Sequence, residues 1–326
     1  MKTIRWGIIG VGDVCEVKSG PAFQKAPGSE LVAVMRRDGA KAEDFARRHG
    51  VANWSSVASD LLESEQTDAI YIATPPNAHV DYAIQALSAG KHVYLEKPMA
   101  RNAKEARKIL QAAEKSSHKL VVAHYRRRLP LYQQIKEILA NEELGKARYV
   151  SLQTIQPEND PLIAASEDYW RVQPEISGGG IFHDLSPHQL DLILYFFGDP
   201  LSISGTASRR MPNARCDDCV AGQMSFFGDV VFQGYWDFAS QDGTIVDACE
   251  IKCDHGALRF SFFRSPKLEI VRSGNMETVE FLPPVHIQQP MIEAVNAYFR
   301  GEAENPCHAA TGVKVMEMID SLSGSA

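Results

Sequence analysis

The stretch that decides the fold is Thr3-Ile4-Arg5-Trp6-Gly7-Ile8-Ile9-Gly10-Val11-Gly12-Asp13-Val14-Cys15. Its first half is a mostly apolar run, which predicts a buried strand. The turn that follows has the spacing of the G-x-G-x-x-G dinucleotide fingerprint, with Cys15 in the last glycine place. Gly10 permits the tight turn, and Gly12 lets the backbone approach a pyrophosphate at the start of the next helix. A strand directly before the turn strengthens a motif that is weak alone, so we expect a Rossmann-type domain here.

Strand-like and helical patterns alternate from this turn as far as residue 123. The further strand-like runs are Glu30–Met35, Asp68–Ala73, Lys91–Leu95 and Lys119–Ala123. Apolar residues at helical spacing separate these runs, and glycines such as Gly50 and Gly90 close the helices. Strict alternation of this kind predicts an α/β domain with a doubly wound parallel sheet over residues 1–123.

The pattern changes at residue 124, where one amphipathic helix is followed by strand-like runs in near succession. These runs are Ala147–Ile155, Leu201–Ala207, Val220–Phe227, Val230–Phe238, Thr244–Lys252, Ala257–Phe263, Lys267–Val271 and Thr278–Leu282. Short turns between strands are typical of antiparallel sheets. Residues 124–326 are therefore expected to form an α+β domain with a large, mostly antiparallel open sheet. Helices expected at Met291–Phe299 and Gly312–Leu322 are candidates to pack back on the first domain.

Composition excludes several classes of partner. The chain has 326 residues and a net charge of −7, which argues against nucleic acid or an anionic membrane. No apolar run approaches the ~20 residues that span a bilayer, and no secretory signal is recognised. Six cysteines in a chain of this length are expected as free thiols in a reducing cytoplasm. Cys216-x-x-Cys219 and Cys249-x-x-x-Cys253 could in principle bind zinc, but small buried thiols explain these residues and no metal is expected.

The end of the second strand bears on cofactor choice. In NAD-binding proteins an acidic residue roughly 20 positions past the glycines accepts hydrogen bonds from the ribose 2′-hydroxyl. This chain has Arg36 there, followed by Arg37. Two guanidinium groups suit a 2′-phosphate, so the pattern favours NADP over NAD. The alternative interpretation is two solvated arginines before a surface helix.

Polar residues follow two of the predicted parallel strands. One strand runs into Thr74-Pro75-Pro76-Asn77-Ala78-His79, and the next into Glu96-Lys97-Pro98. Ligands of open α/β sheets bind beyond the carboxyl ends of the strands. Lys97 is therefore a candidate hydrogen-bond donor in a cleft, and the alternative is a solvated surface lysine. Pro98 fixes the backbone after Lys97, and a cis bond is a candidate there.

A further polar cluster lies in the second half of the chain. It comprises Tyr169-Trp170-Arg171 and Ser177-Gly178-Gly179-Gly180-Ile181-Phe182-His183-Asp184-Leu185-Ser186-Pro187-His188-Gln189-Leu190-Asp191. If a helix begins near Gly180, Asp184 and His188 share one face and Pro187 strains the helix. If it begins at Ser186, that residue caps the helix and Pro187 takes the first helical position. A neutral His188 suits a general base near pH 7; the alternative is a structural His–Asp pair.

These motifs together resemble the Gfo/Idh/MocA oxidoreductase family, which includes inositol, xylose and dihydrodiol dehydrogenases and glucose–fructose oxidoreductase. The resemblance covers nearly the whole length and rests on Gly10-Val11-Gly12, Thr74–His79, Ala89–Val93, Glu96-Lys97-Pro98, Trp170-Arg171 and Gly178–Asp191. It implies a Rossmann domain, an α+β domain whose open sheet often makes the oligomer contact, and hence a homodimer or homotetramer.

The resemblance also implies roles for individual residues. Lys97, Asp184 and His188 correspond to a catalytic trio that moves a hydride between nicotinamide and a secondary alcohol carbon of a sugar, polyol or cyclic diol. The residues expected to bind the cofactor are Gly10, Gly12, Asp13, Val14, Arg36, Arg37, Thr74, Pro75, Asn77, His79, Glu96, Lys97, Trp170 and Arg171. Cys15 and Arg36 depart from the family pattern, and the second departure supports NADP.

Other interpretations remain open at this level. An NAD-dependent glycosidase with a retained cofactor, or a non-enzymatic cofactor-binding regulator, would share the fold and motifs. Loops at Gln156–Ser166 and Met211–Asp218 are expected to set substrate specificity. Aromatic residues in two of the predicted strands are expected to supply a surface for a second subunit, unless a helix of the same chain covers them. They are Phe226, Phe232, Tyr235, Trp236 and Phe238.

Overall fold

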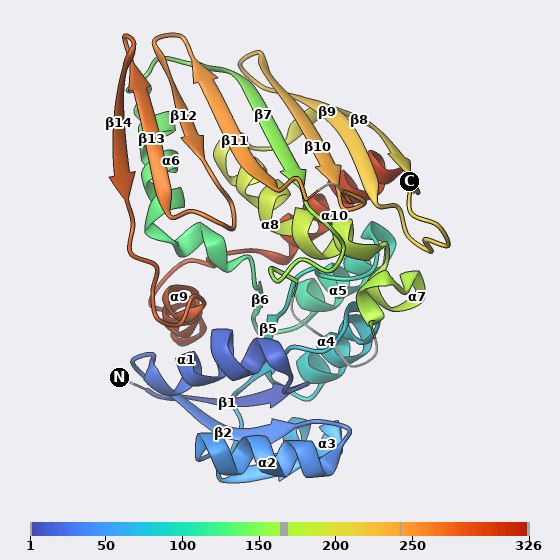
Figure 1. Ribbon diagram of the computed structural model, residues 1–326. Helices are drawn as coiled ribbons and strands as arrows, with labels where there is room; N and C mark the ends of the chain where they lie inside the picture. Colours follow the sequence, from blue (N-terminus) through green and yellow to red (C-terminus); the bar gives the residue numbers. More distant parts are fainter. Residues whose placement is uncertain (1, 164–168, 242, 325–326) are drawn as a thin grey trace. The chain divides into compact units, whose positions relative to one another are not determined.

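The computed structural model of the chain describes residues 2–163, 169–241 and 243–324. They divide into two units (Figure 1). The first unit is Met1–Tyr125 with Pro284–Val313, and the second is Arg126–Pro283 with Lys314–Ala326. The division places residues 284–313 with the N-terminal residues and residues 314–326 with the second unit, whereas the sequence patterns suggested one cut near residue 123.

The first unit is built on a six-stranded parallel sheet in the order β3-β2-β1-β4-β5-β6. Its strands are β1 (Ile4–Ile9), β2 (Ser29–Met35), β3 (Asn53–Ser55), β4 (Ala69–Ile72), β5 (His92–Leu95) and β6 (Leu120–Val122). The central strands are almost continuously buried because helices cover both faces, which explains their unbroken apolar runs. The predicted doubly wound sheet is confirmed. The short edge strand β3 was not predicted, since its residues are largely exposed.

Helices cover both faces of this sheet. They are η1 (Cys15–Ser19), α1 (Gly20–Lys25), α2 (Gly39–His49), α3 (Ala58–Leu62), η2 (Pro76–Ala78), α4 (His79–Ser88), α5 (Ala103–Lys115) and α9 (Gln289–Arg300). Trp6 of β1 packs on Phe23 of α1 and Phe299 of α9, with ring centroids 4.7 and 5.6 Å apart. A Cβ built on the next residue, Gly7, would lie 3.3 Å from Leu61 of α3. Neighbouring residues of β1 therefore face different helix layers, as the pleat requires.

The second unit is built on an eight-stranded sheet in the order β14-β13-β12-β11-β7-β10-β9-β8. Its strands are β7 (Ala147–Ile155), β8 (Pro200–Ser208), β9 (Cys219–Phe226), β10 (Val230–Asp237), β11 (Val246–Cys253), β12 (Gly256–Phe260), β13 (Lys267–Arg272) and β14 (Asn275–Glu280). Every neighbouring pair is antiparallel except β7 and β10, which are parallel. The predicted large, mostly antiparallel open sheet is confirmed.

Helices lie against one face of this sheet, among them α6 (Pro130–Ala140), α8 (Gly180–Phe197) and α10 (Ala309–Ser323) (Figure 1). The shorter helical segments of this part of the chain are η3 (Tyr125–Arg128), η4 (Trp170–Val172) and α7 (Pro174–Ser177). Gln189 anchors α8 to the sheet because its amide nitrogen donates to Thr154 Oγ1 at 2.7 Å and its oxygen accepts from Trp236 Nε1 at 2.7 Å. The end of α10 packs closely, since a Cβ on Gly205 would lie 2.3 Å from the Leu322 carbonyl oxygen.

The expected aromatic outer face is wrong for four of the five residues, and only Tyr235 of the five lies on the open face. Phe226, Phe232, Trp236 and Phe238 are at most 1% exposed. Residues of β10 alternate between the two faces, and Phe182 of α8 packs on Trp236 at 5.2 Å between ring centroids. A helix of the same chain therefore covers this face.

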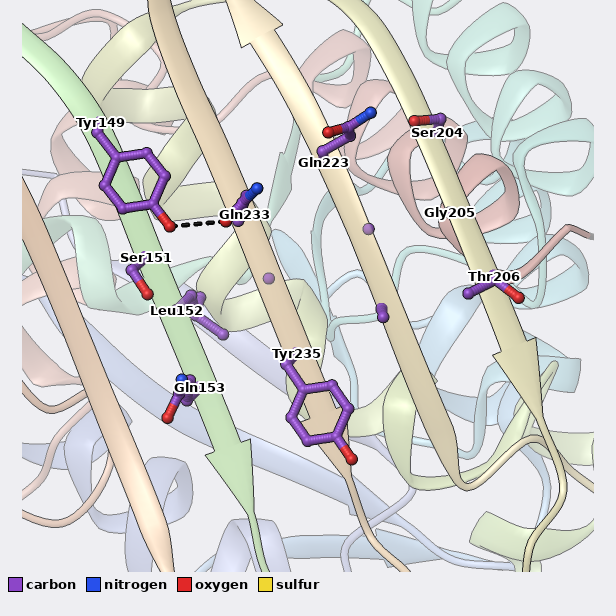
Figure 2. A pocket seen from close by; sticks show the side chains of 13 residues that line it. Tyr149, Ser151, Leu152, Gln153, Ser204, Gly205, Thr206, Gln223, Gln233 and Tyr235 are labelled. Atoms are coloured by element: carbon purple, nitrogen blue, oxygen red, sulfur yellow. Dashed lines mark hydrogen bonds between the residues drawn. The ribbon is translucent and has the colours of Figure 1, made fainter.

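The opposite face carries polar side chains (Figure 2). Tyr149 and Gln233 are joined there by a hydrogen bond of 2.7 Å from the phenol to the amide oxygen. Tyr235 lies further along β10 on the same face as Gln233. Ser151, Gln153, Gln223, Ser204 and Thr206 also line the depression of about 550 Å³ on this face.

Candidate active site

The carboxyl edge of the first sheet brings several predicted site residues together. Backbone hydrogen bonds from Ala73 N to Ile9 O (2.9 Å) and from Glu96 N to Ile72 O (3.0 Å) keep β1, β4 and β5 in step as they end. The turns that begin at Gly10, Ala73 and Glu96 therefore leave the sheet side by side at one edge. This is the edge at which open α/β sheets bind ligands.

The glycine-rich turn fits the close approach of a phosphate-bearing group. Gly10 has a φ of 95°, and a Cβ there would lie 2.7 Å from Thr74 Cγ2, so only glycine is accommodated. A Cβ on Gly12 would meet nothing nearer than 3.9 Å, so the backbone is open on that side. Asp13 is exposed and Val14 is half-buried. Thr74 Oγ1 is buried and has no hydrogen-bond partner among the described residues.

Cys15, which replaces the third glycine, is fully buried, and burial raises the pKa of its thiol to about 12. The helix that follows opens with one π-helical turn, in which Gly20 N donates to Cys15 O. A Cβ on Gly20 would lie 2.3 Å from that carbonyl oxygen. The larger residue is therefore accommodated by a widened turn that needs glycine at its far end.

Two arginines follow β2. Arg36 is half-buried, and its guanidinium donates to Val11 O at 3.2 Å, which ties the side chain to the glycine-rich turn. Arg37 is exposed. The nearby carboxylate of Asp38 accepts from Lys41 N at 3.2 Å as the N-cap of α2. Positive charge therefore predominates where β2 ends.

His79 joins the two turns that follow β4 and β5. It is fully buried, with Nδ1 3.0 Å from Pro98 O and Nε2 2.8 Å from Thr74 O. Burial lowers the pKa of its imidazole. Both ring nitrogens lie against carbonyl oxygens, so His79 holds the turns in place and presents no exposed atom. In the same turn Pro75 is half-buried and Asn77 is exposed.

Glu96 is a buried carboxylate with three donors. Its Oε1 accepts from the Tyr71 hydroxyl at 2.5 Å and from Gln288 Nε2 at 2.8 Å, and its Oε2 accepts from Lys97 N at 3.0 Å. Burial and this carboxylate raise the pKa of Tyr71 well above its usual value. Lys97 itself is half-buried, and its bond to Pro98 is cis, as the sequence suggested. The network fixes the backbone from which the Lys97 side chain extends.

In the second unit, Arg171 and Asp184 form an ion pair. Arg171 Nε lies 2.8 Å from Asp184 Oδ2, and the two side chains are only 11% and 12% exposed. The guanidinium stacks on the half-buried Trp170, 4.5 Å from its ring centroid. A residue expected to bind cofactor is thus paired with one expected to act in catalysis.

Helix α8 begins at Gly180 and continues through Pro187, so the alternative start at Ser186 is wrong. Asp184 and His188 therefore lie one turn apart on one helix face. His188 is 6% exposed, and its ring lies 6.0 Å from that of Phe263.

Two glycines at the start of α8 make room for neighbouring side chains of the same chain. A Cβ on Gly179 would lie 2.2 Å from the His183 ring, and one on Gly180 would lie 2.6 Å from Cys216 Cβ. His183 is buried, which lowers the pKa of its imidazole to about 4. Side chains of the same unit therefore occupy the space that a Cβ at either glycine would need.

Two sequence comparisons bear on this arrangement. Residues 4–124 match a family model described as an oxidoreductase family with an NAD-binding Rossmann fold, and residues 132–259 match the Gfo/Idh/MocA C-terminal domain. The chain belongs to the Gfo/Idh/MocA oxidoreductase family. Oxidoreductase P35 from Formosa agariphila is 44% identical over 99% of both chains. The NAD⁺-dependent scyllo-inositol 2-dehydrogenase from Bacillus subtilis is 28% identical over 62% of this chain and 56% of that one.

Solved structures show the same fold in other members. Levoglucosan dehydrogenase, in complex with NADH and levoglucosan, superposes with a TM-score of 0.86 at 22% identity over 98% of this chain and 96% of that one. A putative NADPH-dependent oxidoreductase from Desulfitobacterium hafniense gives 0.87 at 20% identity over 100% and 96%. At these identities the likeness concerns the fold.

In this Gfo/Idh/MocA oxidoreductase, Asp191 was named from the sequence as part of a motif, but its partner was not. Asp191 is 1% exposed, and both its oxygens accept from Arg127 Nε, at 2.9 and 3.0 Å. Gln288, Tyr71 and Phe263 were not singled out from the sequence. The partners are up to 192 residues apart in sequence, and no local pattern marks such a pairing.

The loops expected to set specificity are described in part. In Met211–Asp218, the Asp218 carboxylate accepts from Arg210 N at 2.8 Å and from Met211 N at 2.9 Å. In the other loop, residues 164–166 lie outside the described residues.

Within the part of the chain that the structure covers, no group of three or more His, Cys, Asp or Glu could hold a metal ion. No helix there is long and apolar enough to cross a membrane.

Proposed function

We propose that this chain is an NADP-preferring oxidoreductase that transfers a hydride between nicotinamide and a secondary alcohol or ketone carbon of a sugar, polyol or cyclic diol. The observation that carries this proposal is the shared edge of the first sheet. There the glycine-rich turn at Gly10 and the Glu96-Lys97 segment leave the same edge on either side of β4, and backbone hydrogen bonds tie both of them to that strand.

The residues at this edge fit a dinucleotide. Gly12 leaves its backbone open to a phosphate group, and the buried hydroxyl of Thr74 has no partner among the described residues. Pro75, Asn77, Asp13 and Val14 extend the same turns. When bound, the nicotinamide supplies the hydride donor or acceptor. The protein's task is to hold the substrate carbon and to manage the proton and charge on its oxygen.

The NADP preference rests on charge at the end of β2. Arg36 is held at the glycine-rich turn through Val11 O, and Arg37 follows it. The carboxylate of Asp38 caps α2, and Arg36 stands where NAD-binding proteins carry the acidic ribose ligand. Guanidinium groups recognise phosphate through paired, charge-assisted hydrogen bonds, which favours a 2′-phosphate.

Lys97 is proposed to hydrogen-bond the reacting oxygen and stabilise the negative charge that grows there during oxidation. Its backbone is fixed by the Glu96 network, so the ammonium group extends from a rigid anchor. Glu96 and His79 are proposed to act on the cofactor site by holding its turns, because their polar atoms are taken up by protein groups.

His188 is proposed as the base that takes the hydroxyl proton in oxidation and returns it in reduction. Asp184 lies one helical turn earlier, and its carboxylate is paired with Arg171. We assign Asp184 a role in binding a substrate hydroxyl or orienting His188. Arg171 pairs with that carboxylate and stacks on Trp170, so the carboxylate is held in one orientation.

The names of relatives support a ring-shaped substrate. They include scyllo-inositol 2-dehydrogenase, 1,5-anhydro-D-fructose reductase and levoglucosan dehydrogenase, each named for a sugar or cyclitol. A cytoplasmic setting accords with six free cysteines among the described residues.

We further propose that the open face of the second sheet makes a homodimer or homotetramer contact. Val231, Gln233 and Tyr235 of β10 face outward, and the depression in Figure 2 offers amide, hydroxyl and phenol groups to a second copy. A polar, aromatic-containing surface of this kind is typical of non-obligate interfaces.

The test of the function is a screen of pyranoses, inositols, cyclic diols and linear polyols with NADP and with NAD, followed at the nicotinamide absorbance in both directions. We expect reversible turnover of at least one ring compound, faster with NADP. An absence of net nicotinamide oxidation or reduction across the panel, together with cleavage of glycosides, would favour the glycosidase alternative and contradict the proposal.

A further inference from the structure

A turn of the second unit holds a half-exposed phenylalanine beside His188. The Phe263 ring lies 6.0 Å from the His188 ring, with the two planes at 69°. Phe263 is half-exposed, whereas its neighbour Phe262 is 2% exposed. Small-molecule sites are lined mainly by apolar and aromatic side chains around a few polar groups. An aromatic ring that stays exposed next to a candidate base therefore has the character of a substrate wall.

The turn is fixed by one carboxylate. Strand β12 ends at Phe260, which pairs with Cys249 of β11, and the chain then leaves the sheet. Asp247, two residues before Cys249, accepts hydrogen bonds from the backbone amides that follow the end of β12. Its carboxylate accepts from Phe262 N at 3.1 Å, Phe263 N at 2.6 Å and Arg264 N at 3.0 Å, and from the Ser261 hydroxyl. A carboxylate with four donors holds the turn more firmly than a neutral acceptor does.

The other side of the turn is held by Arg126 and Tyr132. Both donate to the Phe262 carbonyl oxygen, at 2.5 and 2.8 Å. The Arg126 guanidinium also stacks on Phe263, 4.7 Å from the ring centroid. The cation holds one face of the ring through a cation–π contact. The orientation of Phe263 is thus determined from both sides before any substrate arrives.

We propose that Phe263 is a specificity-determining residue: its ring forms the apolar wall of the substrate site and packs against the C–H face of a ring-shaped sugar or cyclitol. Asp247 is the positioning residue that presents it. The inference rests on the proposed function, because it assigns the substrate class of that same site. A rigid ring offers a preformed apolar face, whereas a linear polyol must lose internal rotations to offer one.

The test compares Phe263→Ala with Phe263→Tyr, and uses Phe227→Ala as the matched control. Phe227 is 87% exposed in the turn between β9 and β10. For each holoenzyme, kcat and KM are measured with pyranoses and inositols and with sorbitol and glycerol. Phe263→Ala is expected to raise KM for ring compounds about tenfold or more, with a much smaller change for linear polyols. Phe263→Tyr and Phe227→Ala should leave the ratio of ring to linear kcat/KM close to that of the wild type.

Asp247→Leu tests the positioning role. We expect the same selective loss of ring substrates, although Asp247 does not reach the exposed ring surface. A fall in the amount of folded enzyme lowers both substrate classes equally, so the ring-to-linear ratio separates positioning from stability. Asp247→Asn, which keeps acceptor capacity, should lie between the wild type and Asp247→Leu.

The outcomes are distinguishable. If the wild type is active and Phe263→Ala leaves the ring-to-linear ratio unchanged, the wall is overturned while the proposed function stands. If Phe263→Ala shifts the ratio and Asp247→Leu does not, the positioning role of Asp247 is overturned. If the wild type turns over no compound with either cofactor, the proposed function and the wall both fall.

Discussion

Arg171 and Asp184 form a nearly buried ion pair that joins η4 to α8, with Nε 2.8 Å from Oδ2. The sequence assigned the arginine to the cofactor and the aspartate to catalysis. Their direct contact means that a change to either residue alters the surroundings of the other. Neither residue is therefore expected to behave as an independent contributor to activity or stability.

Removal of the arginine alone should destabilise the fold more than removal of both charges of this pair. Arg171→Met removes the cation beside a nearly buried carboxylate and is expected to cost about 3 kcal/mol, seen as a lower melting temperature. The double variant Arg171→Met/Asp184→Asn removes the charge as well and should recover much of that loss. Arg215→Met is the control, because its pair with Glu175 is 58% and 54% exposed and should cost less than about 1 kcal/mol. Equal costs for Arg171→Met and Arg215→Met would contradict the interpretation.

Cofactor preference should reverse at the end of β2. Arg36→Asp is expected to lower the NADP-to-NAD affinity ratio by about tenfold or more, because a guanidinium that faces the 2′-phosphate becomes a carboxylate. Titration of both cofactors, followed by protein fluorescence, measures the ratio. Arg47→Asp makes the same charge change on the exposed surface of α2 and should leave the ratio unaltered. A wild type that prefers NAD would disprove the NADP assignment.

The contribution of Glu16 to the stability of the first unit should be lost in acid. Arg48 and His49 hold the pKa of Glu16 at about 2, below its ordinary value of 4.5. A depressed carboxyl pKa stabilises the fold above pH 4.5, and this contribution is lost as the pH falls towards 2. The melting-temperature difference between the wild type and Glu16→Gln should therefore be largest near pH 6 and shrink below pH 4.5. Glu114→Gln, on the exposed side of α5, is the control. A difference that stays constant from pH 6 to pH 3 would count against the pair.

The assembly should depend on the open face of the second sheet. Gln233→Arg places a charge on the centre of this face, and in a symmetric contact the same charge would come from the second copy. Light scattering after size-exclusion chromatography should show a mass that falls towards that of one 36.1 kDa chain. Lys108→Glu on α5 should not change the mass. A wild type that already has the mass of one chain would disprove the proposed contact.

Much of the fold could be predicted because buried strands and helices require apolar residues at characteristic spacings in the sequence. Strand β7 was predicted at Ala147–Ile155 and has those bounds. The strand predicted at Ala257–Phe263 ends instead at Phe260, since Asp247 takes the next amides. Asp247 accepts these hydrogen bonds from β11, a different strand, and no pattern within residues 257–263 reveals that contact.

The candidate site was predictable where it depends on strand ends. Lys97 was singled out because the carboxyl ends of parallel strands meet at one edge, and the structure has that geometry. The residues that hold the backbone of Lys97 in place through Glu96 were not predictable. Gln288, at the N-cap of α9, bonds to Glu96 from 192 residues away in the sequence, and Tyr71 bonds to it from the neighbouring strand β4. The aromatic outer face was mispredicted because alternation in β10 does not say which face the helices cover.

The most direct test of the central claim is the turnover of Lys97→Met with NADP and an active ring substrate from the screen. Methionine keeps the length of the side chain and removes the charged donor. We predict that kcat falls by about 100-fold or more, because the growing charge on the reacting oxygen loses its stabilising partner, while the affinity for NADP stays close to that of the wild type. Turnover retained within a few-fold of the wild type would contradict the assignment of Lys97 and with it the proposed mechanism.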